Sequence, residues 1–160
     1  MTKLTYLGHS AFELEADGKS VLIDRFLTGN STAINSPDDF IPQTILLTHA
    51  HNDHVGDTVE IAKRANAQVI ATHELATWLG WRGVANATGG NIGGTIAFDG
   101  GTAKFVPAWH TSSFIEGETI VAPGVPSGLV VQFGGRTIYF AGDTCLFGDM
   151  ALIGEEGLDV

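Results

Sequence analysis

Residues Thr48–His54 read Thr-His-Ala-His-Asn-Asp-His, which places three histidines and one carboxylate within seven positions. The apolar run Ile45–Leu47 comes directly before them and predicts a buried strand that ends at Thr48. Neutral imidazole nitrogen and carboxylate oxygen are the ligands that borderline divalent ions such as Zn²⁺ prefer. A polar surface loop would also be rich in histidine, but four ligating side chains directly behind a buried strand favour a metal site.

The spacing inside this segment predicts two neighbouring metal positions. Residues i and i+2 of an extended segment point the same way, so His49 and His51 can converge on one point. Asp53 and His54 fall where the chain turns into the helical pattern of residues 55–65, and they can face a second point.

Three more chemistry-bearing residues follow predicted strands. Leu22-Ile23-Asp24, Trp109-His110 and Gly142-Asp143-Thr144 each put a ligating side chain just past an apolar run. His110 supplies what His49 and His51 lack, since a catalytic zinc takes three protein ligands and keeps one position for water. Asp24 is either a turn or capping residue or a support for the ligands, and both interpretations stay open.

Together with Gly8-His9-Ser10, these motifs resemble the His-x-His-x-Asp-His signature of the metallo-β-lactamase-like hydrolase superfamily. In particular they resemble its branch of small bacterial and archaeal metal-dependent hydrolases related to the ascorbate-phosphate lactonases. The resemblance runs from Leu4 to Val160. It implies an α/β (α+β) fold, a four-layer αββα sandwich with the metal centre along one edge between two sheets.

The resemblance also implies roles for the site residues. One or two divalent ions are expected, zinc in the first place, with Mn, Fe or Ni as alternatives. The first is held by His49, His51 and His110, and the second by Asp53, His54 and the bridging Asp143, with Asp53 also catalytic and Asp24 supporting the centre. His9 either contacts substrate or is structural. Many relatives carry proline after the aspartate that corresponds to Asp24, whereas this chain has Arg25. We expect Arg25 to place a cation near the site mouth.

The predicted function is therefore a metal-dependent hydrolase that directs a metal-activated hydroxide at a small ester, lactone or phosphoester. The alternatives are a phosphodiesterase or nuclease, and a non-catalytic metal-binding fragment or subunit. Eight basic residues against 18 acidic ones, a net charge of −10, disfavour nucleic acid as a partner and leave a small molecule as the expected substrate. A homo-oligomer stays open.

Length and composition predict one domain over residues 1–160, with 44% hydrophobic and 16% charged residues. No window approaches the roughly 18 apolar residues of a membrane span. The N-terminus has no signal-peptide pattern, and the single Cys145 fits a reducing cytosol, so we expect a cytoplasmic protein without disulfides.

Other segments have plain structural interpretations. Residues 86–94 read as a tight surface turn between strands, and residues 111–126 as an irregular loop that could be a lid over the site. Trp78 and Trp81 are expected to pack in the core or between helices, Cys145 to be a small packing residue, and His73 to lie at the surface or cap a helix.

Relatives in the resembling branch continue beyond the point that corresponds to Val160 and supply a last histidine to the second metal position. We expect the C-terminal strand and helices to be missing here, with no histidine of this chain able to take that place, because His9 and His73 lie in other motifs. The explanations are a shortened chain, a polypeptide divided in two, or a short natural form with a weakened second site. Apolar residues such as Leu152 and Ile153 would otherwise be uncovered, so we expect one of the first two and a complementary C-terminal segment or second chain.

Overall fold

Two β-sheets pack face to face in the computed structural model, which describes residues 1–160. The larger sheet has the strand order β1-β2-β3-β4-β5-β6, and the smaller has the order β12-β11-β8-β7. The strands of the larger sheet are Lys3–Gly8, Ala11–Ala16, Lys19–Ile23, Thr44–Leu46, Gln68–Thr72 and Ala87–Gly90. In the smaller sheet β7 is Thr95–Phe98, β8 Gly101–Pro107, β11 Ser127–Phe133 and β12 Arg136–Phe140.

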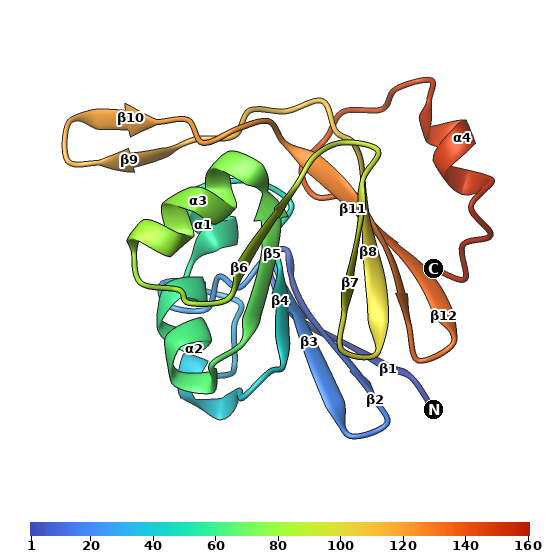
Figure 1. Cartoon of the computed structure of the whole chain (residues 1–160), viewed down its shortest axis with the longest axis horizontal. Coiled ribbons are helices and arrows are strands. Elements are labelled where there is room, and N and C mark those ends of the chain that lie inside the picture. Colours follow the sequence, from blue (N-terminus) through green and yellow to red (C-terminus); the bar gives the residue numbers. More distant parts are fainter.

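Helices cover the outer face of each sheet, as Figure 1 shows. Helices α1 (Asn52–Val55), α2 (Thr58–Ala65) and α3 (His73–Trp81) lie on the larger sheet, and α4 (Met150–Gly154) lies on the smaller one. Ile153 of α4 is buried against Val106 and Val130, whereas Leu152 is exposed. The layers follow the order α, β, β, α, which confirms the predicted sandwich.

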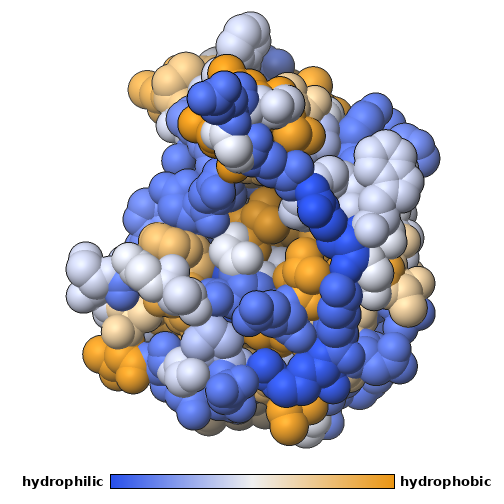
Figure 2. Space-filling model, turned by 90° about the vertical axis from the view of Figure 1, so that its left-hand side faces the viewer, coloured by the Kyte–Doolittle hydropathy of each residue, from blue (hydrophilic) through white to orange (hydrophobic).

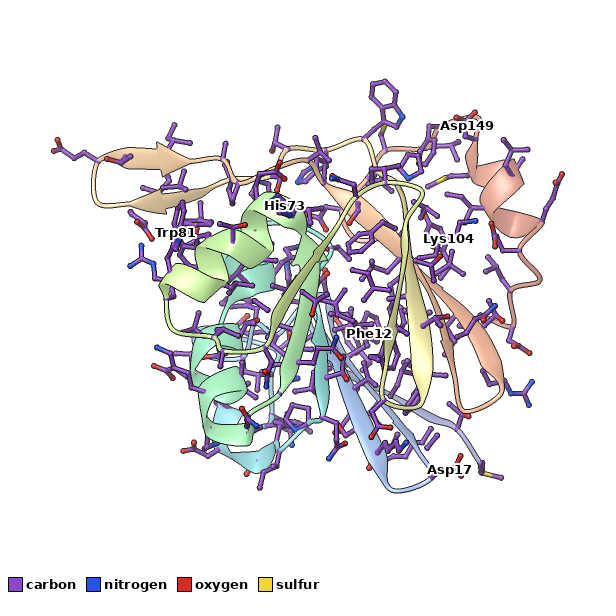
Figure 3. All side chains as sticks on the ribbon, in the orientation of Figure 1. Phe12, Asp17, His73, Trp81, Lys104 and Asp149 are labelled. Atoms are coloured by element: carbon purple, nitrogen blue, oxygen red, sulfur yellow. The ribbon has the colours of Figure 1, made fainter.

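The central strands are buried on both faces because they lie between helices and the second sheet. In β4, Ile45 contacts the helical core, while Leu46 faces the core between the sheets. Phe12 also packs against the inter-sheet core, where Figure 3 shows it. Near-continuous apolar sequence is what such doubly covered strands require.

The strand directions bring the ligating residues to one edge of the molecule. β1 and β3 both run antiparallel to β2, and β4 runs parallel to β3, so the segments that follow these three strands emerge on the same side. β8 and β12 likewise both run antiparallel to β11. Residues that follow β1, β3, β4, β8 and β12 can therefore meet between the sheets.

The helix predicted over residues 55–65 is divided in two. Gly56 (φ 40°) ends α1, and Asp57 begins the next turn with its N–H donating to the Arg25 carbonyl at 2.8 Å. The Asp57 carboxylate accepts the N–H groups of Leu27 and Thr28 at 2.8 and 3.0 Å. These hydrogen bonds hold the loop after β3 against the break between α1 and α2, and helical periodicity in the sequence does not reveal this contact.

Residues 86–94 are not only a surface turn, since Ala87–Gly90 forms the edge strand β6, parallel to β5. Glycine is required there because both faces are crowded. A Cβ on Gly89 would lie 2.8 Å from the His73 Cα, and one on Gly90 would lie 2.5 Å from the Phe105 ring.

Residues 111–126 contain a hairpin, β9 (Phe114–Glu116) and β10 (Thr119–Val121), so the prediction of an irregular loop was wrong. The hairpin extends over α3 (Figure 1), where the Phe114 ring packs on Trp78 at 4.5 Å and Glu116 pairs with Arg82. Trp81, at the end of α3 in Figure 3, is 79% exposed rather than packed as predicted.

Two other side chains differ from the predictions. Arg25 is fully buried over the Phe40 ring, 4.0 Å from its centre, and not at the site mouth. Cys145 is exposed rather than a packing residue. The longest helix, α3, has nine residues, and no helix has the length and hydrophobicity needed to span a membrane.

Candidate metal centre

Four ligating side chains from three loops converge at the predicted first metal position. His51 Nδ1 lies 3.1 Å from His49 Nε2 and 3.3 Å from His110 Nε2. The Asp143 carboxylate lies 3.5 Å from His110 Nε2. His49 is buried, His51 and Asp143 are half-buried, and His110 is more exposed, so the cluster opens to solvent on one side.

The spacing of these atoms fits a single ion. Donor atoms about 2.1 Å from a tetrahedral ion lie about 3.4 Å from one another. The lone pairs of neutral imidazoles repel when they face each other without a shared proton or cation. The three imidazoles and the carboxylate are therefore suited to hold a divalent metal.

A second cluster lies beside the first and consists of His9, Asp53 and His54. His9 Nε2 is 3.1 Å from the Asp53 carboxylate, and His54 Nε2 is 3.4 Å from Asp143 Oδ1. The expectation that His9 lies in the wrong motif to join Asp53 and His54 was wrong, because β1 delivers it to the same sheet edge. His73 joins neither cluster and is exposed at the start of α3.

Asp24 lies beneath both clusters, buried and with a left-handed backbone (φ 47°). Its carboxylate accepts the Thr48 N–H at 2.9 Å, the Thr48 hydroxyl at 2.6 Å and the His54 Nδ1–H at 3.0 Å. Because the Thr48 hydroxyl gives its only hydrogen to Asp24, it must accept the Nδ1–H of His49, 2.9 Å away. Asp24 therefore engages Nδ1 of His54 directly and Nδ1 of His49 through Thr48, which directs Nε2 of both rings towards the site.

Comparison with known proteins agrees with this arrangement. The family model described as "Beta-lactamase superfamily domain" matches residues 22–160. A UPF0173 metal-dependent hydrolase of Geobacillus thermodenitrificans is 54% identical over 154 residues, which are 96% of this chain and 68% of that protein. The chain belongs to the UPF0173 family of the metallo-β-lactamase superfamily.

Other members of the UPF0173 family and a solved structure extend this result. A UPF0173 metal-dependent hydrolase of Methanopyrus kandleri is 50% identical over 96% of this chain and 66% of its own length. Igni18, a metallo hydrolase of Ignicoccus hospitalis, matches with a TM-score of 0.82 and 37% identity over 96% of this chain and 66% of that chain. The chain thus spans about two thirds of the length of these relatives. A complementary C-terminal segment or second chain stays a prediction.

In this UPF0173 site the local electrostatics favour the neutral form of two histidines of the first cluster. Burial and the neighbouring His54 lower the pKa of His49 to about 4, and burial and His110 lower the pKa of His51. Burial also acts to lower the pKa of His54, but the hydrogen bond to Asp24 and the charges of Asp24, Asp143 and Asp53 together outweigh it, so the pKa is raised. At neutral pH, His49 and His51 are therefore uncharged and can donate lone pairs.

The carboxylate of the second cluster is ionised at neutral pH. Burial acts to raise the pKa of Asp53, but its own backbone N–H and the neighbouring histidines, His54 first among them, together outweigh this and hold the pKa below its usual value. An ionised carboxylate at this place can bind a cation or accept a proton.

Several hydroxyl groups that the sequence did not single out fix the three loops. Ser127 Oγ donates to the Thr48 carbonyl at 2.8 Å, and Ser112 Oγ accepts the Ala50 N–H at 3.2 Å. Thr144 Oγ1 accepts the Trp109 N–H at 2.9 Å. Thr111 Oγ1 lies 3.2 Å from His51 Nε2 and orients that ring. The adjacency of Thr111 and Thr144 to His110 and Asp143 was the only signal for them in the sequence.

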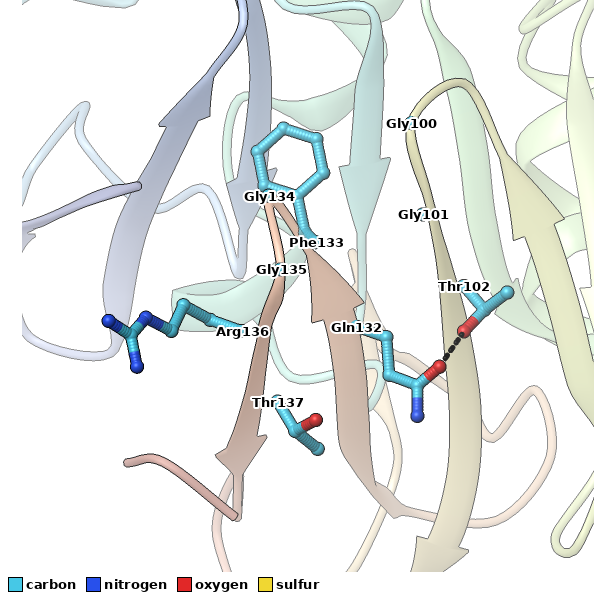
Figure 4. Close-up of a pocket in the computed structure, with 9 residues that line it drawn as sticks. All are labelled: Gly100, Gly101, Thr102, Gln132, Phe133, Gly134, Gly135, Arg136 and Thr137. Carbon is cyan, nitrogen blue, oxygen red and sulfur yellow. Dashed lines mark hydrogen bonds between the residues drawn. The ribbon is translucent and has the colours of Figure 1, made fainter. Parts of the chain in front are cut away.

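The site is distinct from two other surface features. Figure 2 shows a hollowed face, with hydrophobic side chains above the hollow at the β9–β10 hairpin. In this hairpin Ile115 and Ile120 are cross-strand partners, and both are exposed. Figure 4 shows a depression at the tips of the β7–β8 and β11–β12 hairpins, where Thr102 bonds to Gln132. It lies at the start of β8, whereas His110 follows the end of that strand, and it contains no ligating side chain.

Proposed function

We propose that this chain hydrolyses a small ester, lactone or phosphoester at the paired clusters. The observation that supports it most strongly is the convergence of His49 Nε2, His51 Nδ1 and His110 Nε2 within 3.1–3.3 Å contacts beside the Asp143 carboxylate. A bound divalent ion supplies a Lewis acid and a water whose pKa falls to about 7. Zinc suits this set of nitrogen and oxygen donors, as do manganese, iron and nickel.

The residues of the two clusters and Asp24 have different roles in the proposed reaction. His49, His51 and His110 would hold the first ion, and Asp53 and His54 would hold the second, with the Asp143 carboxylate available to both. Asp53 is ionised and half-exposed, so its carboxylate can orient the attacking water and accept its proton. Asp24 keeps the His49 and His54 rings in the tautomer that presents Nε2.

Side chains near the site indicate what part of a substrate they could contact. Trp109 adjoins His110 and is 68% exposed, and Leu146 follows Asp143 by three residues and is 89% exposed. We infer that they contact an apolar portion of the substrate, next to the ester or lactone group. The net charge of −10 supports a small substrate over a nucleic acid.

Hydrolysis of p-nitrophenyl acetate, a γ-lactone and bis(p-nitrophenyl) phosphate, with and without chelator, tests the proposal. Turnover of at least one substrate should vanish when metal is removed, return on addition of Zn²⁺ or Mn²⁺, and be lost in His51→Ala. His73→Ala, which removes an exposed histidine outside both clusters, should keep full activity. Turnover that survives metal removal or His51→Ala would overturn the proposed function.

A further inference from the structure

The second cluster joins two parts of the chain that no motif connects. His9 follows β1, and Asp53 and His54 lie in α1, yet one ligand atom of each residue lies within 4.8 Å of those of the other two. The His9 ring is set edge-on between Phe26 and His54, with ring centres 5.8 and 5.5 Å away. These contacts orient the imidazole so that its Nε2 faces the Asp53 carboxylate, 3.1 Å away.

His54 brings an unsatisfied nitrogen to this cluster. Its ring is fully buried, and its Nδ1–H is used by Asp24, but its Nε2 has no hydrogen-bond partner. Asp143 Oδ1 lies 3.4 Å from that nitrogen without the geometry of a hydrogen bond. Buried polar atoms are rarely left unpartnered, so this nitrogen indicates a position where a ligand is bound.

The backbone at His9 is held in a conformation that histidine rarely adopts. His9 has φ 53°, after Gly8 with φ 102° and an irregular step in the β1–β2 register. The His9 N–H donates to Thr32 Oγ1 at 3.2 Å, and a Cβ on Gly8 would lie 2.7 Å from the same atom. Residues held in the left-handed region by their surroundings occur preferentially at functional sites.

A hydrogen bond between His9 and Asp53 does not by itself account for the left-handed backbone at His9 and the unpartnered nitrogen of His54. Both side chains are more than 40% exposed, and such pairs contribute little to stability. A cation shared by both would use the His9 nitrogen, the Asp53 carboxylate and the unpartnered nitrogen of His54 at once.

We propose that His9 is a ligand of the second metal position, through Nε2, together with Asp53, His54 and Asp143. The inference rests on the proposed function, since it completes the second cluster of that site. Two nitrogens and two carboxylates form a full donor set for zinc, manganese, iron or nickel.

Titration of the metal-depleted chain with Co²⁺ or Zn²⁺ tests this proposal, followed by calorimetry and by the visible absorption of bound Co²⁺. His9→Asn is the informative variant because asparagine tolerates the left-handed backbone and removes the imidazole. His73→Ala is the matched control. We expect two metals per native chain and per control chain, and a second site at least ten-fold weaker in His9→Asn, with the first site unchanged.

Two results would overturn the proposal: only one metal bound by the native chain, or two metals bound by His9→Asn with native affinity and spectrum. Loss of turnover in His9→Asn with both metals still bound would also overturn it, because His9 would then act on substrate. Two metals in the native chain, a weakened second site in the variant and no turnover in either would support the ligand role while refuting the proposed function. Thermal melts of each variant verify that it is folded.

Discussion

Replacing Asp24 with asparagine should disable two metal ligands at once. An asparagine carries one acceptor and one donor group, whereas Asp24 accepts three hydrogen bonds. If the amide oxygen takes the Thr48 N–H, the amide nitrogen faces the Thr48 hydroxyl and His54 Nδ1. His54 must then carry its proton on Nε2. The Thr48 hydroxyl turns its hydrogen towards His49, whose proton also moves to Nε2.

The size of the effect follows from these contacts. Loss of an outer hydrogen-bond partner of a metal ligand typically costs about 10–100-fold in metal affinity. We expect the upper end, about 100-fold or about 2.7 kcal/mol, because one substitution protonates the metal-facing nitrogens of both His49 and His54. Two charge-assisted hydrogen bonds are also lost, each worth about 1.5–3 kcal/mol of folding stability.

Competition of the protein with a chromophoric chelator for Zn²⁺ measures the affinity, and long-range ¹H–¹⁵N spectra of the metal-free protein report the tautomers. Asp17→Asn is the matched control, since Asp17 has φ 52°, close to the 47° of Asp24, but is exposed in a turn. Native zinc affinity in Asp24→Asn, or unchanged Nε2 lone pairs on both rings, would refute the reasoning.

Three further predictions concern stability and protonation. Arg25→Met should leave the melting temperature unchanged or higher, because the three buried guanidinium nitrogens have no hydrogen-bond partner; a fall of more than about 5 °C would contradict this. Gly56→Ala should lower the free energy of unfolding in denaturant melts by more than about 3 kcal/mol, since its Cβ would lie 2.1 Å from the Arg25 carbonyl oxygen. Gly135→Ala, with open space around it, should lower the free energy of unfolding by about 1 kcal/mol. Equal losses in the two variants would refute the steric account. In metal-free protein, NMR titration should show His49 uncharged down to about pH 4 and His54 still charged above pH 6.5. The lowered pKa of His49 then removes stability as pH falls from 6.5 towards 4, while the raised pKa of His54 adds stability that is lost as pH rises through its folded value.

The fold and most of the candidate site were predictable because their signals are local. Apolar runs gave the strands, and the dense segment from His49 to His54 gave the pair of metal positions. His110 and Asp143 were found because each follows such a run. The structure brings all of these residues together as predicted, and their roles as ligands stay predictions.

The remaining features depend on contacts between distant segments. His9 meets Asp53 only because β1 and β4, the strands that precede them, run in the same direction within the larger sheet. Asp24 controls two histidines through one threonine, a network that exists only in the folded chain. The burial of Arg25 follows from the loop that docks at Gly56, which no periodicity in the sequence encodes.

Anomalous diffraction from crystals of the chain loaded with zinc would test the account most directly. We predict two neighbouring peaks, one among His49, His51 and His110 and the other among His9, Asp53 and His54, with Asp143 between them. No peak at the three histidines of the first cluster, or peaks only at surface carboxylates, would contradict the proposed metal centre.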